Sequence, residues 1–256
     1  MSKPAKWLFV SDVDDTLLGN TAALETLAAA LQPARPEIIL AWNSSRPCAS
    51  LRQSLQKHPA LPTPDFLIGA LGTEIEDGLT GQPLDEYTQF LGREWNREEL
   101  VALLAPFGFA PHPEKYQRPF KLSYDIPGEA AYTAVQNHLR HSGHFPHKVR
   151  TIFSMGHNLD LIPAEAGKGN VIHWLAQHVG VPAERVIVAG DSGNDLDMFT
   201  TPHPYKGIVV GNAEPALKML ESPHIYQATA VQAAGVLAGL QHWQALPPAH
   251  HQEEQK

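Results

Sequence analysis

The stretch FVSDVDDTLLGN, residues 9–20, sets three carboxylates, Asp12, Asp14 and Asp15, directly behind an apolar run. The run itself, in KWLFVSD, is typical of a short buried strand that ends in polar residues. After the carboxylates, residues 20–32 (NTAALETLAAALQ) place leucine and alanine at helical spacing behind N-capping residues. The stretch therefore predicts a strand, a loop and a helix, with the negative charge crowded into the loop.

The same order of elements recurs along the chain. An apolar run ends in polar residues at 37–47 (EIILAWNSSRP), 65–72 (DFLIGALG), 184–195 (ERVIVAGDSGND) and 206–212 (KGIVVGN). Helical patterns follow several of these runs, among them residues 48–58 (CASLRQSLQKH). Strands this apolar, separated by helices, are typical of a parallel sheet covered on both faces. We therefore expect an α/β fold with a doubly wound, Rossmann-like core domain.

The middle of the chain has a different pattern. Its helical and strand-like segments alternate without the apolar run that ends in Gly or Asp. The helical segments are 96–108 and 128–143, and the strand-like segments are 120–126 and 148–155. We therefore expect an inserted α+β domain at residues 84–156, between the two parts of the core domain at 1–83 and 157–256.

Composition excludes several function classes. The 256 residues include 19 Lys and Arg against 27 Asp and Glu, and a formal charge of -8 is opposite to what a nucleic-acid surface needs. Cys48 is the single cysteine, which excludes an internal disulfide and a Cys-rich zinc site. We expect no signal peptide, because the apolar run in the first residues is too short, and no membrane span, because no stretch approaches ~20 apolar residues. We therefore expect a cytoplasmic protein that binds neither nucleic acid nor membranes.

Polar residues follow the predicted strands at one edge of the sheet. They are Asp12 and Asp14 after the first strand, Ser44 and Ser45 after the second, and residues 190–195 after a late one. Because loops at the carboxyl ends of parallel strands meet on one rim, we expect these side chains to share a site. Lys168 precedes a further helix, whose N-terminus favours an anion.

Four carboxylates near one point repel strongly unless a cation or raised pKa values relieve the crowding. Oxygen ligands without Cys or clustered His suit a hard ion such as Mg²⁺. A lysine and two hydroxyls beside such a site would suit a phosphate group, and a carboxylate can attack phosphorus to form an acyl phosphate. The pattern therefore indicates phosphoryl-transfer chemistry.

Four motifs, in order, resemble those of the haloacid dehalogenase-like phosphohydrolase superfamily: DVDDT, Ser44 in WNSSR, Lys168 in KGN, and GDSGND. The insertion between the second and third motifs resembles the type 2 cap of that superfamily. Within it, the chain is most similar to sucrose-phosphate phosphatases, on the segments GALGTEI, QRPFKLSYDIPG and NLDLIPAEAGKGN.

The resemblance implies a role for each motif residue. Asp12 would be the nucleophile, and Asp14 the general acid that later activates water. Ser44 and Lys168 would hold phosphate oxygens, and Thr16 would brace the loop. The implied Mg²⁺ ligands and supporting residues are Asp12, Asp14 through its carbonyl, Asp191, Asn194 and Asp195. The implied sugar-contacting residues are Ser45, Arg46, Glu74, Lys121, Ser123 and Tyr124.

The resemblance implies a Mg²⁺-dependent phosphatase that converts sucrose 6-phosphate to sucrose through an aspartyl phosphate. Two alternatives stay open: a phosphatase of glucosylglycerol, mannosylglycerate or mannosylfructose phosphate, and a non-catalytic partner of a sugar-phosphate synthase. We expect a monomer, and consider association with such a synthase. Two departures stand out, because relatives commonly have Gly in place of Ser45 and Asn or Gly in place of Asp15.

Overall fold

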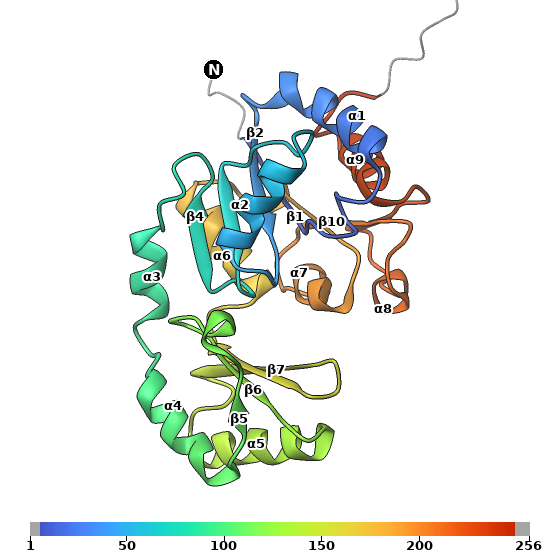
Figure 1. The fold of residues 1–256 in the computed structure, drawn as a ribbon. Helices are drawn as coiled ribbons and strands as arrows, with labels where there is room; N and C mark the ends of the chain where they lie inside the picture. The colour runs from blue at the N-terminus through green and yellow to red at the C-terminus, as the bar shows by residue number, and fades with distance from the viewer. Residues whose placement is uncertain (1–5, 249–256) are drawn as a thin grey trace, which may run out of the picture.

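The computed structural model describes residues 6–248, in which two β-sheets lie one above the other (Figure 1). Residues 1–5 and 249–256, which we assigned to the core domain, lie outside the described residues. The larger sheet has seven strands in the order β11-β10-β9-β1-β2-β3-β4. Its strands are β1 (Trp7–Ser11), β2 (Ile38–Asn43), β3 (Phe66–Gly69), β4 (Glu74–Asp77), β9 (Val186–Gly190), β10 (Lys206–Val209) and β11 (Ile225–Gln227). All neighbouring pairs are parallel except β3 and β4.

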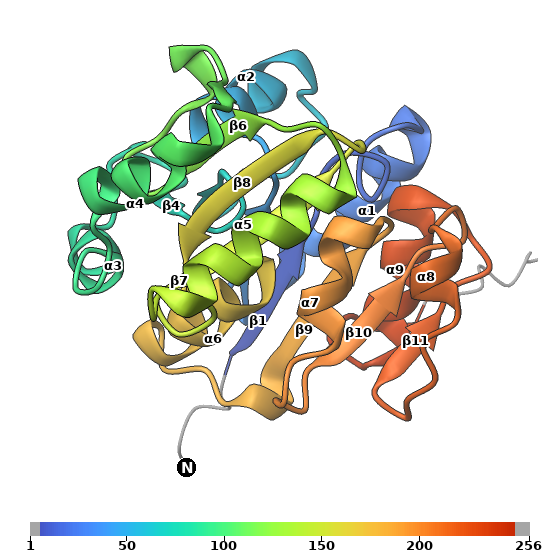
Figure 2. The ribbon, with the colours of Figure 1, turned by 90° about the horizontal axis from the view of Figure 1, so that it is seen from below.

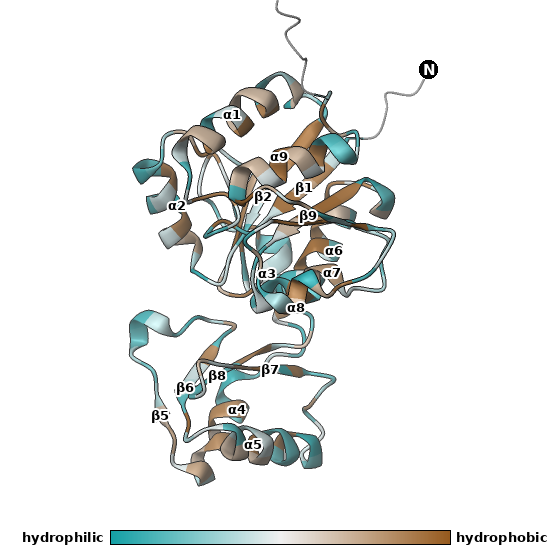
Figure 3. Cartoon of the chain, turned by 90° about the vertical axis from the view of Figure 1, so that its right-hand side faces the viewer, coloured by the Kyte–Doolittle hydropathy of each residue, from teal (hydrophilic) through white to brown (hydrophobic). Residues whose placement is uncertain are grey.

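Helices cover both faces of this sheet, as the apolar strands predicted. The helices are α1 (Thr21–Leu31), α2 (Cys48–Lys57), α8 (Pro215–Lys218) and α9 (Gln232–His242) on one face, and α3 (Asp85–Leu91), α6 (Lys168–His178) and α7 (Leu196–Phe199) on the other. Along β1, Phe9 packs with the first group, whereas Leu8 and Val10 pack with the second. The doubly wound fold is therefore confirmed, and Figure 3 shows the central strands β1 and β9 as largely hydrophobic.

Local sequence explains where the first helix begins. Asn20 is the N-cap of α1, and its Oδ1 accepts a hydrogen bond from the backbone N–H of Ala23 at 3.1 Å. Leu24, Leu27 and Leu31 lie on the buried side of the helix. The loop between β1 and α1 is thus held at both ends, which fixes the carboxylates it carries.

The smaller sheet has four antiparallel strands in the order β5-β6-β8-β7. They are β5 (Ala110–Pro111), β6 (Leu122–Asp125), β7 (Val149–Ser154) and β8 (Asn158–Pro163). Helices α4 (Arg97–Leu104) and α5 (Glu129–His141) cover the outer face, with α5 nearest the viewer in Figure 2. Because β8 pairs with both β6 and β7, this sheet continues past residue 156, where we expected the insertion to end. The segment NLDLIP forms β8, and its own sequence does not indicate that β6 and β7 are its partners.

The inner face of the smaller sheet is turned toward the core. Ile152 packs against the core cluster on the α6 face, and Ile162 belongs to that cluster. Arg150 donates to the carbonyl of Ala166 at 3.0 Å and forms a 3.2 Å ion pair with Asp197 of α7. Residues of β6, β7 and β8 that share this side therefore face the part of the chain that carries the larger sheet, which lies above them in Figure 1.

An unusual turn follows β3. Ala70, Leu71 and Gly72 all have left-handed backbone, with φ of 50°, 63° and 76°. The backbone of this turn bonds to the preceding loop, from the Ala70 N–H to the Arg46 carbonyl at 2.8 Å. A Cβ on Gly72 would lie 2.6 Å from the carbonyl oxygen of Gly167, so only glycine allows this approach. The turn therefore ties the Ser44 loop to the start of α6.

Among residues 6–248, no helix has both the length and the apolar character needed to cross a membrane.

Candidate active site

The rim predicted from strand order exists. In the register of the sheet, Ser11 at the end of β1 lies beside Trp42 of β2 and Ala189 of β9. The N–H of Asp12 donates to the carbonyl of Ala189 at 2.9 Å, which fixes the first residue of the loop against the neighbouring strand. The side chains that follow β1, β2 and β9 are therefore brought to one point.

Lys168 lies where these loops meet, between Asp12 and Asp195. Its Nζ donates to Oδ1 of Asp12 at 2.7 Å and to Oδ1 of Asp195 at 2.6 Å, and its side chain is only 1% exposed. Burial alone would lower the pKa of Lys168, but the charges of Asp195 and Asp12 outweigh that effect and raise it. The ammonium group is therefore held charged between two carboxylates.

Asp12 is buried, with 5% of its surface exposed. Burial raises its pKa to about 7, the charges of Asp195 and Asp191 add to the rise, and Lys168 opposes it. Because Asp12 has one buried cationic partner and two anionic neighbours, a further cation would stabilise its charged form.

Asp191 is the second carboxylate of the rim, at the end of β9. Its Oδ1 accepts a 2.8 Å hydrogen bond from Oγ1 of Thr16, which is itself fully buried. Burial raises the pKa of Asp191 to about 6, and the charges of Asp195 and Asp15 act in the same direction. Thr16 thus joins the β1 loop to the β9 loop, in agreement with the bracing role that we expected.

Asp195 is fully buried, and its two oxygens have different partners. Oδ1 binds Lys168, whereas Oδ2 accepts the N–H groups of Asp191 at 3.0 Å and Ser192 at 3.1 Å. A Cβ on Gly190 would come within 2.7 Å of the Asp195 Cβ, so glycine is required where the loop folds back. These contacts suit a residue that orients the loop and the lysine.

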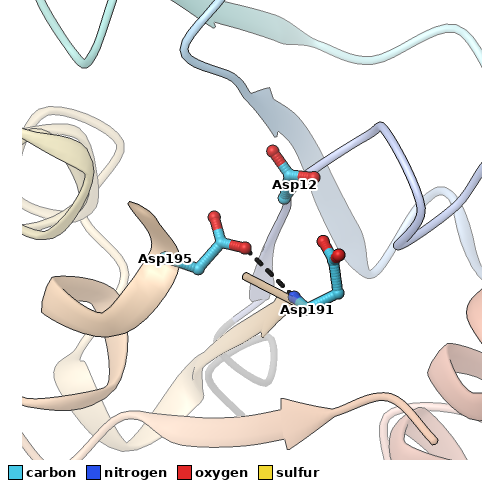
Figure 4. A group of neighbouring side chains, drawn as sticks. All are labelled: Asp12, Asp191 and Asp195. Atoms are coloured by element: carbon cyan, nitrogen blue, oxygen red, sulfur yellow. Dashed lines mark hydrogen bonds between the residues drawn. The ribbon is translucent and has the colours of Figure 1, made fainter. Parts of the chain in front are cut away.

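Asp12, Asp191 and Asp195 together fit a divalent cation. Each offers one oxygen, and these oxygens all lie within 4.8 Å of one another. Figure 4 shows Asp12 and Asp191 directed toward the same space, with Asp195 beside them. An all-oxygen donor set of this kind suits Mg²⁺. The predicted ligand Asn194 lies beside this group with its side chain exposed.

Asp14 differs from the buried carboxylates. Its side chain is 52% exposed and forms a 2.7 Å ion pair with Nε of Arg46. Nη1 of Arg46 also donates to Ser50 and Ser54, at 3.2 and 2.9 Å. The guanidinium of Arg46, which we predicted to contact the sugar, holds the exposed Asp14 side chain in this structure.

The loop after β2 supplies a buried hydroxyl. Ser44 is 1% exposed, and its Oγ accepts the Arg46 N–H at 3.1 Å, which leaves the hydroxyl proton available to a phosphate oxygen. Ser45 is exposed, so the side chain that replaces glycine points into solvent. Asn43, which we did not single out, is fully buried and donates to the carbonyl of Lys168 at 2.9 Å. Its signal was its place directly before Ser44 at the strand end.

Glu74 joins the core to the smaller sheet. Its Oε2 accepts the N–H of Cys48 at 3.0 Å, and its Oε1 forms a 3.0 Å ion pair with Arg118. Both oxygens therefore already have partners, and a sugar hydroxyl would have to share one of them. Arg118 was not predicted, because a long-range ion pair leaves no pattern near either residue.

On β6, the predicted sugar contacts divide between two faces. Lys121 and Ser123 both reach Oδ1 of Asp160, at 3.3 and 2.5 Å, on the side turned toward the core. Tyr124 is 7% exposed and packs in the outer apolar cluster with Leu122. The expectation that Tyr124 contacts the sugar is therefore wrong, because successive strand residues point to opposite faces.

Asp15 has left-handed backbone with φ of 57°, and its carbonyl accepts a hydrogen bond from Asn212 at 2.8 Å. Gly and Asn adopt this conformation at low cost, and Asp tolerates it. This explains the residue types usual at this position, and the exposed Asp15 carboxylate needs no catalytic role.

Cys48 is fully buried at the first turn of α2, with its Sγ directed at the carbonyl of Leu67 at 3.4 Å. Burial raises the pKa of the Cys48 thiol, and the charge of Glu74 adds to the rise. We expect iodoacetamide to leave the folded protein unlabelled and fully active, and to label it once in urea. Mass spectrometry measures both, and rapid labelling of the folded protein would contradict the buried role.

Over most of its length the chain is similar to known phosphatases of sugar phosphates. The family model of sucrose-6F-phosphate phosphohydrolase matches residues 5–244. Mannosylfructose-phosphate phosphatase of Agrobacterium fabrum is 30% identical over 254 residues, which cover 96% of this chain and 99% of that protein. Sucrose-phosphatase 1 of Nicotiana tabacum is 28% identical over 262 residues, covering 96% of this chain but only 61% of that longer protein.

Solved structures agree with these relatives. The sucrose-phosphatase of Synechocystis, determined in complex with sucrose and phosphate, has a TM-score of 0.80 and 29% identity, and covers 94% of this chain and 98% of its own. A haloacid dehalogenase-like hydrolase from Bacillus subtilis has a TM-score of 0.71 at 19% identity, covering 94% and 93%, and shows the fold alone. The superfamily predicted from the four motifs is thereby confirmed.

Proposed function

The chain belongs to the sucrose-6F-phosphate phosphohydrolase family, and on that premise we propose that it hydrolyses sucrose 6-phosphate to sucrose and phosphate. The observation that carries the proposal is Lys168, buried between Asp12 and Asp195. A buried ammonium beside a carboxylate of raised pKa provides both a nucleophile and a counter-charge for a phosphate group. Together with a divalent cation, this arrangement would suit a phosphate-bearing substrate.

In this mechanism, an oxygen of Asp12 attacks phosphorus and the bond to the sugar oxygen breaks. Asp14 gives a proton to the departing sugar oxygen and then takes one from the water that hydrolyses the aspartyl phosphate. Ser44 and Lys168 hold the phosphate oxygens, and Lys168 shields their charge from Asp12. The ion pair of Asp14 with Arg46 sets the side chain of the acid at the entrance, where the sugar leaves.

Asp12, Asp191 and the backbone carbonyl of Asp14 would hold Mg²⁺, with Asp195 and Asn194 supporting the same region. The ion supplies positive charge that neutralises the phosphate and the crowded carboxylates. The raised pKa values of Asp12 and Asp191 support this assignment, since they measure how unfavourable the carboxylate charges are without a cation.

The pKa values give a pH test of the cation site. Asp12 and Asp191 titrate at about 7 and about 6 in the folded protein, against 3.8 as their ordinary value. At pH values between the ordinary pKa and the raised pKa, the folded state binds more protons than the unfolded state. The free energy of unfolding of the metal-free protein therefore falls as the pH rises from about 4 to about 7. A divalent cation competes with these protons. We expect Mg²⁺ to raise the melting temperature by several degrees at pH 8 and hardly at all at pH 5.

Differential scanning fluorimetry with and without Mg²⁺ measures this response. An Asp191→Asn variant is the matched control, because it removes one proposed ligand and keeps the shape of the side chain. An equal shift at both pH values, or an undiminished shift in Asp191→Asn, would count against the cation site.

We propose that the segment with the smaller sheet, residues 84–163, acts as the cap and supplies sugar contacts. Lys121, Ser123 and Asp160 form a connected polar group on the side turned toward the core. Such a group offers donors and acceptors to sugar hydroxyls, and a cap that closes over the rim would keep water from the nucleophile.

A second candidate is mannosylfructose phosphate, favoured by the 30% identity to a mannosylfructose-phosphate phosphatase over nearly the whole of both chains. The test is kcat/KM for phosphate release, with Mg²⁺, from sucrose 6-phosphate, mannosylfructose phosphate, glucosylglycerol phosphate, mannosylglycerate phosphate and fructose 6-phosphate. We expect kcat/KM for sucrose 6-phosphate to exceed kcat/KM for fructose 6-phosphate by about a hundredfold, roughly 2.7 kcal/mol of discrimination. If kcat/KM is instead highest for mannosylfructose phosphate, that compound is the substrate, and the proposed mechanism is unchanged. Absence of turnover on every phosphate would favour a docking role on a synthase.

Association with a sugar-phosphate synthase, a monomeric state and a cytoplasmic location are further parts of the proposal. They rest on the composition of the chain and on its family. Size-exclusion chromatography with and without a synthase would test the first two.

A further inference from the structure

Arg150 belongs to strand β7 of the smaller sheet, and its side chain reaches the core just before Lys168. Its Nη1 donates to the carbonyl of Ala166 at 3.0 Å. The next residue, Gly167, lies so close to the guanidinium that a Cβ there would overlap Nη1 of Arg150. Lys168 follows directly, as the first residue of α6. Arg150 therefore packs against the backbone that determines where the Lys168 side chain starts.

The same guanidinium also holds α7. Its Nη2 forms a 3.2 Å ion pair with Oδ2 of Asp197, and Arg150 is the only ion-pair partner of Asp197 in the described part of the chain. Asp197 lies two residues after Asp195, whose Oδ1 accepts the 2.6 Å bond from Lys168. The backbone of Asp197 is itself close to α6, because a Cβ on Gly169 would overlap the Asp197 carbonyl oxygen. One guanidinium therefore joins the two segments that carry Lys168 and Asp195.

The contacts of Lys168 depend on how α6 and α7 lie against each other. Its Nζ lies 2.7 Å from Asp12 and 2.6 Å from Asp195, and Asp195 directly precedes α7. Hydrogen bonds weaken steeply away from their best geometry, and a catalytic group has to be held within about 0.5 Å of its productive position. A small shift of one helix against the other would change both contacts. The position of the ammonium group therefore depends on the residues that fix these two helices.

We propose that Arg150 is a positioning residue for the reaction, which acts by holding Lys168 and Asp195 in register. The inference rests on the proposed function, since that function assigns the phosphate to Lys168. The guanidinium bonds to Ala166 and Asp197, so its effect on the phosphate is indirect. Because Arg150 belongs to β7, a movement of the smaller sheet also changes these bonds. The position of the phosphate-binding lysine is thereby linked to the position of the smaller sheet.

Arg150→Ala and Arg35→Ala form a matched pair of variants. Arg35 also pairs with one carboxylate, that of Asp65, at 2.9 Å, and donates to one backbone carbonyl, that of Ile38, at 3.1 Å. The side chains of Arg150 and Arg35 are similarly exposed, at 32% and 31%. Arg35 precedes β2, however, at the edge of the sheet opposite to Asp12. Both variants should lose similar stability, whereas only Arg150→Ala should lose activity.

The measurement is kcat/KM for phosphate release, with Mg²⁺, from sucrose 6-phosphate and from p-nitrophenyl phosphate, which contains no sugar. We expect Arg150→Ala to lower kcat/KM about thirtyfold on both esters, a smaller loss than removal of Lys168 itself would cause. Arg150→Lys should recover part of this loss, because an ammonium group replaces the charge but not the fork of the guanidinium. Equal losses in Arg150→Ala and Arg35→Ala, or a loss confined to sucrose 6-phosphate, would overturn the positioning role.

Chemical rescue tests the contact itself. Arg150 and Asp197 line a cavity of about 410 Å³, so a guanidinium ion can reach the space that the truncated side chain leaves. We expect guanidinium chloride, at a concentration that does not unfold the protein, to raise the activity of Arg150→Ala severalfold and to leave Arg35→Ala unchanged. Sodium chloride at the same concentration is the control for ionic strength. No rescue, or equal rescue by sodium chloride, would overturn the role of the guanidinium.

Binding of inorganic phosphate separates this inference from the proposed function. Calorimetry with phosphate and Mg²⁺ requires no turnover, and we expect Arg150→Ala to weaken the affinity about tenfold, because Lys168 no longer holds its position. Arg35→Ala should bind phosphate as wild type does. If the wild-type protein hydrolyses neither ester, the proposed function fails, while the phosphate titration still decides the role of Arg150. Phosphate binding that is absent in the wild type, or equally strong in Arg150→Ala, would overturn it.

Discussion

Asp12→Asn should abolish turnover while the protein remains folded. The amide has the same shape but cannot attack phosphorus, so we expect kcat to fall by at least about 10³-fold. The fold should tolerate the change, because burial already disfavours the charge of Asp12, as its pKa of about 7 shows. Lys168 keeps Asp195 as an ionic partner. Phosphate release and the melting temperature measure the two effects.

Asp15→Asn is the matched control for that variant. It makes the same change three residues later, at an exposed position whose left-handed backbone asparagine accepts readily. We expect near wild-type turnover, with the pKa of Asp191 somewhat lower because a neighbouring charge is gone. Mass spectrometry should verify that the amide introduced by Asp12→Asn has not deamidated back to the carboxylate. Retention of most activity in Asp12→Asn would remove Asp12 as the nucleophile.

Lys168→Met should damage both stability and activity. The change leaves two carboxylates buried without their cation, and removing one member of a buried ion pair typically costs about 3–5 kcal/mol. The loss should be larger at pH 8 than at pH 5, because Asp12 is protonated below its raised pKa of about 7. We also expect kcat/KM to fall by about 10²–10³-fold, since a charge that stabilises the phosphate is lost.

Urea denaturation at the two pH values measures the stability of Lys168→Met, and Lys218→Met is its control. Lys218 is exposed at the end of α8, so its replacement removes a positive charge without burying an unpaired one. Added Mg²⁺ should restore part of the stability of Lys168→Met. A loss that is the same at both pH values, or no larger than that of Lys218→Met, would contradict the role of Lys168 as the counter-charge.

The sequence predicted this site well where one structural rule was sufficient. Parallel strands end on the same edge of a sheet, so Asp12, Ser44 and Asp191 had to meet once the strands were recognised. Lys168 followed from its position at the start of a helix. The structure adds what such a rule does not predict: Lys168 contacts both Asp12 and Asp195, and burial raises the pKa values of Asp12 and Asp191.

Two features of the site were harder to predict, for different physical reasons. Arg46 and Glu74 form ion pairs with Asp14 and Arg118, and nothing in the sequence near one partner identifies the other. Tyr124 is a different case, because its alternation with Leu122 already indicated the apolar face of the strand. The strand period was informative there, and the resemblance to the family led away from it.

The stereochemistry at phosphorus tests the central claim most directly. Sucrose 6-thiophosphate, made chiral at phosphorus with ¹⁷O, is hydrolysed in ¹⁸O-water, and the configuration of the released thiophosphate is determined. Attack by Asp12 followed by attack of water inverts the centre twice, so the account predicts overall retention. Overall inversion would mean that water attacks the substrate directly, and would contradict an aspartyl phosphate on Asp12.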